Sequence, residues 1–123
     1  MRTVYVVNKG AHDHSDAERF GRLVYLSDGE INKYSTNKMY RTFADKLRRS
    51  QPDDLILITG LTVMSCIACS CFSFLHRRLN VLLYKMGGTH NGRYIERRLQ
   101  LSNLLTYGPE AQSKQIDELV KEE

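Results

Sequence analysis

Residues 55–75 form a long uncharged run, and this run constrains the fold more than any other part of the chain. Its first four residues are all aliphatic, without the polar alternation of a half-exposed strand, so they predict a strand covered on both faces. Thr59 and Gly60 then interrupt the run. From residue 63 onward the residues are apolar or small on nearly every face, which predicts a largely buried helix capped by the hydroxyl of Thr62. A buried strand followed by a buried helix is half of a βαβ unit.

The same run approaches the length of about 20 apolar residues that a membrane-spanning helix needs. The residues behind it, His76, Arg77 and Arg78, resemble the positively charged flank of such a helix. Against this interpretation, Gly60 and several serines and threonines dilute the run, and two aspartates precede it. The rest of the chain also supplies matching strands, which a lone spanning helix would not need. We therefore interpret the run as the core of a soluble domain.

The chain has 123 residues, which is enough to bury the core of one domain without support from disulfides or metals. We assign residues 1–108 to a single α/β nucleotide-binding domain and residues 109–123 to an acidic tail that is weakly helical or frayed. The tail carries five acidic residues and two lysines, a balance of −3, so the net charge of +4 leaves +7 on the domain. A basic domain suits anionic partners such as nucleotides, nucleic acids or acidic lipids, and a solvated basic surface explains the same charge.

The three cysteines all lie between residues 66 and 71, which excludes an internal framework of disulfides. They favour a reducing compartment, the cytoplasm. Cys66 and Cys69 have CxxC spacing, but no second pair completes a zinc site. The spacing also falls inside the expected helix, whereas a redox CxxC begins at a helix N-terminus. We therefore expect buried cysteines that act as small hydrophobic residues. No secretory signal is expected, because a strand pattern begins almost at Met1.

Further strands and helices are expected around the buried run. The strands are expected at residues 3–7, 22–26, 79–84 and 93–101, the last one antiparallel and near an edge. A capping-box pattern predicts a short helix from residue 15, and an amphipathic helix is expected at residues 36–49. The apolar stripe of this second helix would be Met39, Tyr40, Phe43, Ala44 and Leu47.

The order of these elements predicts a single α/β fold. The sheet would be small and mostly parallel, with an antiparallel final strand and two main helices flanking it. A turn-rich loop is expected at residues 87–92, which include three glycines.

Polar residues follow the ends of the four expected parallel strands. With right-handed crossovers these ends share one rim, where open α/β sheets bind ligands. Free amides at the start of the buried helix point to the same rim and favour phosphate. Taken singly, the Thr59-Gly60 turn lacks the Lys-Ser/Thr ending of a P-loop and the three glycines of a dinucleotide fingerprint, so ordinary turn chemistry explains it as well. Together, a cation, an aromatic ring and a helix N-terminus suit a nucleotide.

His12, Asp13 and His14 resemble a catalytic or metal-binding group. Neighbouring loop residues rarely face one ion together, and no further ligand motif completes them, so we assign no metal and prefer a loop-bracing role. An enzyme that uses His12, Asp13 or Asp28 as acid or base stays open. A third interpretation is a nucleic-acid-binding module, which would use the basic residues of the amphipathic helix, Lys38, Arg41, Arg48 and Arg49.

Three stretches of the chain resemble a known family: TVYVVNKGAHDHSDAERFGRLVYLSDG, DDLILITGLTVMSCIA and NGRYIERRL. They are similar to the first family of Thoeris anti-defence proteins, small phage proteins that sequester nucleotide signals made by bacterial TIR-domain enzymes. The resemblance covers most of the chain up to about Leu101. It implies a small α/β protein of the host cytoplasm that forms dimers or higher oligomers. It also implies that the protein encloses cyclic ADP-ribose derivatives, in some members cyclic oligonucleotides too, without degrading them and without a cofactor.

The expected ligand contacts come from the rim. The residues that would meet phosphate or ribose are Asn8, Lys9, Thr59, Gly60 and Thr62. The ring of Tyr84 would stack on a base, and Arg93 or Arg97 would supply charge for a phosphate from the final strand. No nucleophile or general base is evident in the sequence, which agrees with a protein that stores its ligand unchanged.

Overall fold

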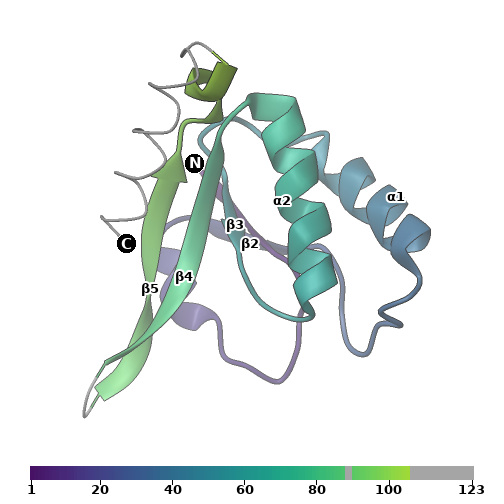
Figure 1. The fold of residues 1–123 in the computed structure, drawn as a ribbon. Coiled ribbons are helices and arrows are strands. Elements are labelled where there is room, and N and C mark those ends of the chain that lie inside the picture. Colours follow the sequence, from purple (N-terminus) through teal and green to yellow (C-terminus); the bar gives the residue numbers. More distant parts are fainter. Residues whose placement is uncertain (88–89, 106–123) are drawn as a thin grey trace.

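A computed structural model of the chain describes residues 1–87 and 90–105, so the expected acidic tail at 109–123 lies outside the described residues. The elements follow one another as β1 (Thr3–Val6), η1 (Ser15–Arg19), β2 (Arg22–Tyr25), α1 (Thr36–Leu47), β3 (Leu55–Leu57), α2 (Thr62–His76), β4 (Leu79–Gly87), β5 (His90–Leu99) and η2 (Leu101–Leu105), where η marks a short 3₁₀ helix. Figure 1 shows α1 and α2 side by side over the sheet.

The five strands form one sheet in the order β2-β1-β3-β4-β5. The pairs β1–β2, β1–β3 and β3–β4 are parallel, whereas β4 and β5 form an antiparallel hairpin. The predicted α/β fold, with a mostly parallel sheet, an antiparallel final strand and two main helices, is therefore confirmed. The carboxyl ends of the four parallel strands share one edge of the sheet, as right-handed crossovers require.

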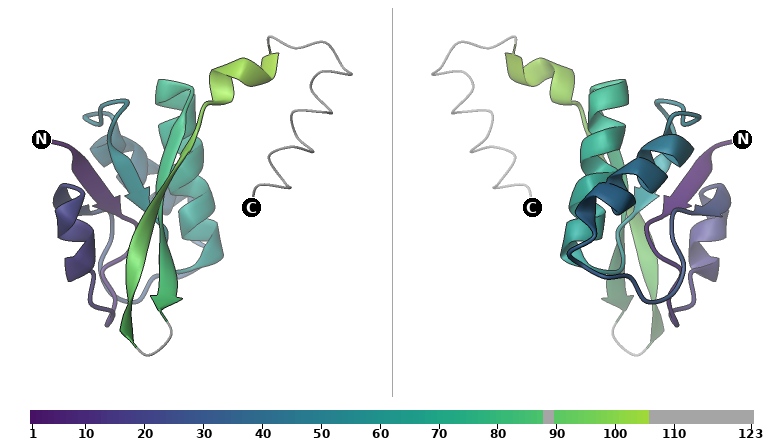
Figure 2. Two further views of the ribbon diagram at one scale, coloured as in Figure 1. Left: turned by 90° about the vertical axis from the view of Figure 1, so that its left-hand side faces the viewer. Right: turned by 90° about the vertical axis from the view of Figure 1, so that its right-hand side faces the viewer.

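The sheet separates two layers of the molecule, as Figure 2 shows. On one face, α1 and α2 enclose a large apolar cluster around Phe43, Phe72 and Ile56. On the other face, η1 covers a smaller cluster that includes Ala17, Leu57 and Tyr94. Successive side chains of a strand point to opposite faces of the sheet, and all three aliphatic residues of β3 are buried. The strand is therefore covered on both of its faces. The prediction of a strand covered on both faces is confirmed.

The prediction that α2 is largely buried is wrong. Met64, Ala68 and Phe72 are buried against the sheet, but Phe74, Leu75 and Cys66 on the outer side are exposed. The expectation of buried cysteines therefore fails for Cys66. The physical reason is that a helix on a sheet has only one neighbour layer, and no described element covers its outer side.

The N-terminal caps of α2 and η1 and the apolar stripe of α1 also differ from the predictions. Thr62 is the first residue of α2 rather than its cap; Leu61 precedes the helix and makes no side-chain capping bond. The short helix expected from residue 15 is present as η1, but Ser15 does not cap it. In α1 the stripe is narrower than expected, because Tyr40 is 56% exposed while Met39, Phe43 and Leu47 are buried.

The β4–β5 hairpin is longer than predicted. The strands run on to Gly87 and begin again at His90, so most of the expected loop at residues 87–92 is strand. Glycine is unfavourable in a strand unless something approaches its backbone closely, and such a contact exists here. The ring of Tyr84 lies where a side chain at position 92 would be, which makes Gly92 a fitting strand residue. Among the helices that the structure describes, none combines the length and the apolar character needed to cross a bilayer.

Candidate functional site

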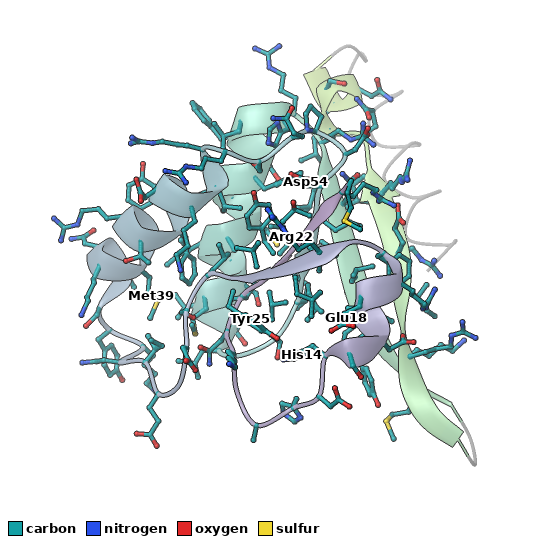
Figure 3. All side chains as sticks on the ribbon, turned by 180° about the vertical axis from the view of Figure 1, so that it is seen from behind. His14, Glu18, Arg22, Tyr25, Met39 and Asp54 are labelled. Carbon is teal, nitrogen blue, oxygen red and sulfur yellow. The ribbon has the colours of Figure 1, made fainter. Side chains whose placement is uncertain are left out.

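A cavity of about 940 Å³ lies at the carboxyl edge of the sheet, on the face that carries η1. Its lining comes from the end of β3, the far half of the β4–β5 hairpin and the loop that leads into η1. The lining residues are His12, Asp13, His14, Ser15, Asp16, Ile58, Thr59, Tyr84, Met86, Gly92, Arg93 and Tyr94. A volume of this size is within the range of sites for small organic ligands. In Figure 3, which views this face, His14 and Tyr25 mark the region between the loop and β2.

Tyr84 is held as an aromatic platform on one wall of the cavity. Its ring meets the ring of Tyr94 edge to face at a centroid distance of 5.3 Å, the arrangement that the ring quadrupoles favour. A Cβ atom on Gly92 would come within 2.3 Å of Tyr84 Cζ, so the missing side chain provides the space for the ring. Tyr84 is nevertheless 51% exposed, which leaves much of its ring free for a ligand.

The loop before η1 and the first turn of η1 are fixed by two aspartates, Asp13 in the loop and Asp16 in η1. Asp13 Oδ1 accepts a hydrogen bond of 2.9 Å from the backbone amide of Ser15, and this bond is the main cause of a lowered pKa for the Asp13 carboxyl group. Asp16 Oδ2 accepts a bond of 2.8 Å from the amide of Tyr94, which likewise lowers its pKa. The expected loop-bracing role is therefore confirmed for Asp13. The loop is bound directly to β5 and forms a fixed wall of the cavity.

His14 is the most buried polar side chain of this wall. It is only 5% exposed, and its Nδ1 lies 2.9 Å from the hydroxyl of Tyr94. Burial, reinforced by the neighbouring His12, lowers the pKa of the imidazole, so His14 is neutral at pH 7. Its Nε2 is buried and has no hydrogen-bond partner among the described residues. His12, by contrast, is exposed at the mouth of the cavity.

Three of the predicted contact residues line the cavity: Thr59, Tyr84 and Arg93. Arg93 is exposed and close enough to Asp16 to contribute to the lowered pKa of that carboxyl group. The backbone of Thr59 is held by the start of α2, because its carbonyl oxygen accepts a bond of 3.3 Å from the hydroxyl of Ser65. The cavity thus combines an aromatic ring, a guanidinium and hydroxyl groups.

Asn8 and Gly60 are structural residues of the rim and do not line the cavity. The Asn8 amide nitrogen donates a bond of 3.0 Å to the carbonyl oxygen of Gly29, and its Oδ1 lies 2.9 Å from the hydroxyl of Ser27. Both polar groups of Asn8 are therefore used in joining the ends of β1 and β2. Gly60 has φ of +82°, and a Cβ there would lie 3.1 Å from Asn8 Cβ. The turn needs glycine for its shape.

Lys9, Thr62 and Arg97 also lie outside the lining. The Lys9 ammonium is 5.4 Å from the ring centroid of Tyr25, whose ring is in turn 6.4 Å from that of His14. Lys9 therefore lies near the loop side of the cavity. Thr62 is exposed at the start of α2. Arg97 is exposed on β5, four residues beyond Arg93 along the strand, and donates to the carbonyl oxygen of Glu96.

Sequence reasoning missed the histidines and aspartates of residues 12–16 as part of the same site. They lie in the connection between β1 and β2, several residues past the end of β1, so the argument from strand ends did not include them. Gly92 was a usable signal, because a glycine two residues before Tyr94 in an alternating strand indicates close approach of another side chain. Within the part of the chain that the structure describes, no group of three or more His, Cys, Asp or Glu side chains could hold a metal ion. The lining groups can bind a polar aromatic ligand through stacking, hydroxyl and guanidinium contacts.

Comparison with known proteins identifies the family. A family model for phage Pam3 gp32-like proteins matches residues 2–101, which is most of the chain. No curated protein and no solved structure is detectably similar to it. The chain therefore belongs to the phage Pam3 gp32-like family and is a phage protein.

Proposed function

We propose that this member of the phage Pam3 gp32-like family binds a nucleotide signal in the cavity beside Tyr84 and sequesters it without degrading it. The observation that carries the proposal is the cavity of about 940 Å³ with a half-exposed aromatic ring on its wall. Nucleobases stack well on such rings. The resemblance to Thoeris anti-defence proteins identifies the expected ligand class as cyclic ADP-ribose derivatives made by TIR-domain enzymes.

Each part of a nucleotide has a suitable group in this cavity. The Tyr84 ring suits the base, and the exposed Arg93 guanidinium suits a phosphate. The carboxylate of Asp13 keeps free acceptor sites beside its bond to Ser15, and carboxylates commonly accept hydrogen bonds from ribose hydroxyls. Because the loop, β3 and the hairpin are joined by hydrogen bonds before any ligand arrives, binding costs little ordering of the protein.

Calorimetry or native mass spectrometry with TIR-produced cyclic ADP-ribose isomers tests this proposal directly. We expect Tyr84→Ala to weaken binding at least tenfold and Tyr84→Phe to retain it, because stacking needs the ring and not the hydroxyl. Tyr34→Ala is the matched control, since Tyr34 is 80% exposed and outside the cavity lining. Equal affinities of the Tyr84→Ala and Tyr34→Ala proteins would contradict the proposed site. Cyclic oligonucleotides, tested in parallel, define the breadth of the ligand class.

Arg93 and Arg97 provide a second matched pair on one strand. Both are exposed, but only Arg93 lines the cavity. We expect Arg93→Ala to reduce affinity and its salt dependence, whereas Arg97→Ala leaves both unchanged. A reversed result would move the site along β5, from Arg93 toward Arg97.

An enzyme that acts on a nucleotide is the second candidate, and the state of His14 favours it. A buried neutral imidazole in a cavity, with Asp13 and His12 beside it, is a feature of acid–base sites. Asp28 drops out of this candidate, because it lines a different hollow near α1. Recovery of labelled ligand after heat denaturation separates the two: intact ligand supports storage, and altered ligand supports turnover.

Assembly is part of the same proposal. The resemblance implies dimers or higher oligomers, and light scattering of the full chain with and without ligand measures this. A strict monomer in both conditions would count against the sequestering assembly.

A further inference from the structure

The two helices that cover the sheet carry almost all of the positive charge of the domain. Residues 36–50 and 62–78, which include α1 and α2 with their ends, contain seven Lys and Arg side chains against one acidic residue, Asp45. Their balance is +6, whereas the rest of residues 1–108 carries only +1. The charge is therefore concentrated on one layer of the molecule, the helix layer that lies over the sheet in Figure 1. Such a concentration attracts anionic partners to that layer.

Five of these seven cations are exposed and have no acidic partner within residues 1–87 and 90–105. They are Lys38, Arg41, Arg48, Arg49 and Arg77. The other two are engaged, because Arg78 pairs with Asp53 at 3.5 Å and the ammonium of Lys46 donates to two backbone carbonyl oxygens. Guanidinium groups without a carboxylate partner suit phosphate oxygens, which they bind through two parallel hydrogen bonds.

An apolar groove of about 600 Å³ lies between α1 and α2, on the side away from the sheet. Tyr40, Ala44 and Arg48 line it from α1 and its end, and residues between 66 and 75 line it from α2. The two helices end together, since the hydroxyl of Ser50 is 2.7 Å from Nε2 of His76. The neighbours of these two residues in the sequence are arginines, so the groove is apolar along its length and basic at this end.

An aromatic ring is exposed at each end of this groove. Tyr40 is 56% exposed in the first half of α1, and Phe74 is 88% exposed near the end of α2. Exposed rings beside an apolar groove mark an interaction site. Nucleic-acid bases stack on such rings whatever their sequence, because every base has a π-face. The sequence had indicated a buried Tyr40, so only the structure places exposed aromatic rings beside the basic residues of α1.

We propose that the helix layer binds single-stranded nucleic acid, with bases stacked on Tyr40 and Phe74 and with phosphates at Arg48 and the neighbouring cations. A single strand supplies both kinds of contact, since its bases are unpaired and every nucleotide carries a phosphate. A second copy of the chain would instead bring two layers of charge +6 together, which is unfavourable. The groove and the cavity beside Tyr84 lie on opposite faces of the sheet, so the two binding activities are independent.

Fluorescence anisotropy of the full chain with labelled oligothymidylate and oligouridylate, each of about 12 nucleotides, tests this proposal. We expect both strands to bind at about 50 mM salt and to bind more weakly as salt increases, because phosphate contacts release counterions. Arg48→Ala should reduce the slope of log Kd against log salt by about 0.7, the value for one contact with a single strand. Arg97→Ala should leave the slope unchanged and is the matched control, since Arg97 is exposed on β5 and outside the groove.

The aromatic contacts are tested by their own variants. Phe74→Ala and Tyr40→Ala should each weaken binding about tenfold, because each removes a stacking surface. Tyr34→Ala is the matched control, since Tyr34 is 80% exposed and does not line the groove. Phe74 and Tyr40 are exposed, so neither substitution opens a cavity in the core, and thermal unfolding of both variants should match that of the wild-type protein.

The same measurements identify the class of partner. An absence of binding at about 50 mM salt overturns the proposal, because phosphate contacts are strongest at low salt. Equal affinities of the Phe74→Ala and Tyr34→Ala proteins also overturn it. Displacement of the labelled strand by polyglutamate or by a DNA duplex, at the same concentration of charge, would show that the helix layer binds any polyanion, acidic proteins included, and would overturn the assignment to single strands.

Discussion

The two faces of the sheet are built from the same strands but carry different kinds of side chain. On the helix face, Phe43, Leu47 and Phe72 pack into a continuous apolar cluster. On the η1 face the apolar cluster is smaller, and at the carboxyl edge it gives way to His14, Asp16 and Tyr84 around a cavity. The helix face of the sheet is covered by packed apolar side chains, whereas the η1 face has a cavity at its carboxyl edge. We therefore expect stability to depend mainly on the helix face, and the proposed ligand binding to depend on the η1 face.

The strand β4 shows how one segment serves both purposes. Its first half pairs with β3 and β5, and Val81 and Leu82 are buried on opposite faces. Its second half extends beyond β3 and pairs only with β5, so Tyr84 and Met86 lie at the cavity with much of their surface exposed. The extension beyond the parallel strands forms one wall of the site, which a shorter hairpin would lack.

The largest effect is expected from a cavity in the helix-face core. Phe43 is 1% exposed, so Phe43→Ala should lower the free energy of unfolding by about 3–5 kcal/mol. If the faces are independent, the surviving folded protein keeps its ligand affinity. Urea denaturation measures the first quantity and calorimetry the second. If the folded fraction of the Phe43→Ala protein binds ligand more weakly, the two faces of the sheet are not independent.

The next effect concerns buried polar groups at the amino edge of the η1 face. Asn80 is fully buried, and its amide nitrogen donates to the carbonyl oxygens of Pro52 and Asp54 at 2.7 and 2.8 Å. Asn80→Ala leaves both oxygens without this partner and should destabilise the protein by about 1–3 kcal/mol, measured by urea denaturation. Figure 3 shows Asp54 and His14 at opposite ends of this face.

Asn80→Ala should therefore leave binding unchanged in calorimetry at a temperature where the variant is folded. This result would show that polar groups of the η1 face fall into two sets. The set at the amino edge stabilises the fold, and the set at the carboxyl edge forms the site. A loss of ligand affinity in the Asn80→Ala variant would show that the two sets of polar groups do not act separately.

Gly92→Ala should have the opposite effect to Asn80→Ala: it should weaken ligand binding and leave stability nearly unchanged. The new Cβ requires Tyr84 to leave its position against Tyr94. The displaced atoms are the outer end of a half-exposed side chain, so the free energy of unfolding should change by less than about 1 kcal/mol. Ligand affinity should fall about tenfold, because the stacking platform is moved. Gly10→Ala is the control, since a Cβ there meets nothing within 4 Å.

The sequence predicted the sheet better than it predicted the surfaces of its helices. The aliphatic residues of β3 and the polar ends of the parallel strands follow local rules, so topology and the shared edge could be deduced. The exposure of Phe74 and Cys66 could not, because an apolar helix surface looks the same whether or not a second layer covers it.

The candidate site was predicted only in part for a similar reason. Tyr84 and Thr59 follow parallel strands and were expected at the edge, but which face of the sheet is hollow depends on the path of the loop before η1. That path is set by the bonds of Asp13 and Asp16 to backbone amides, and the amide bound by Asp16 lies on β5, far along the chain. Long-range bonds of this kind have no signature in local sequence patterns.

The smallest effect, and the one that tests both faces at once, is the dependence of stability on pH. Burial lowers the pKa of His14 on the η1 face and of His76 at the end of α2 below the ordinary value of 6.5. Between the folded-state pKa and 6.5, the unfolded chain binds more protons than the folded one, so stability falls as pH decreases through this window. For a single histidine the loss at pH 5.5 cannot exceed about 1.4 kcal/mol, the value for an imidazole that stays neutral when folded.

His14→Gln should remove one part of this dependence. Glutamine does not titrate and retains a polar group near the hydroxyl of Tyr94, so the difference in unfolding free energy between pH 7.5 and pH 5.5 should shrink. His12→Gln is the control, because His12 is exposed. If the unfolding free energies of both variants depend on pH as that of the wild-type protein does, the titration of His14 does not contribute to the pH dependence of stability. A ligand that stabilises the wild-type protein more at pH 7.5 than at pH 5.5, but stabilises His14→Gln equally at both, would link the neutral imidazole to binding as well as to folding.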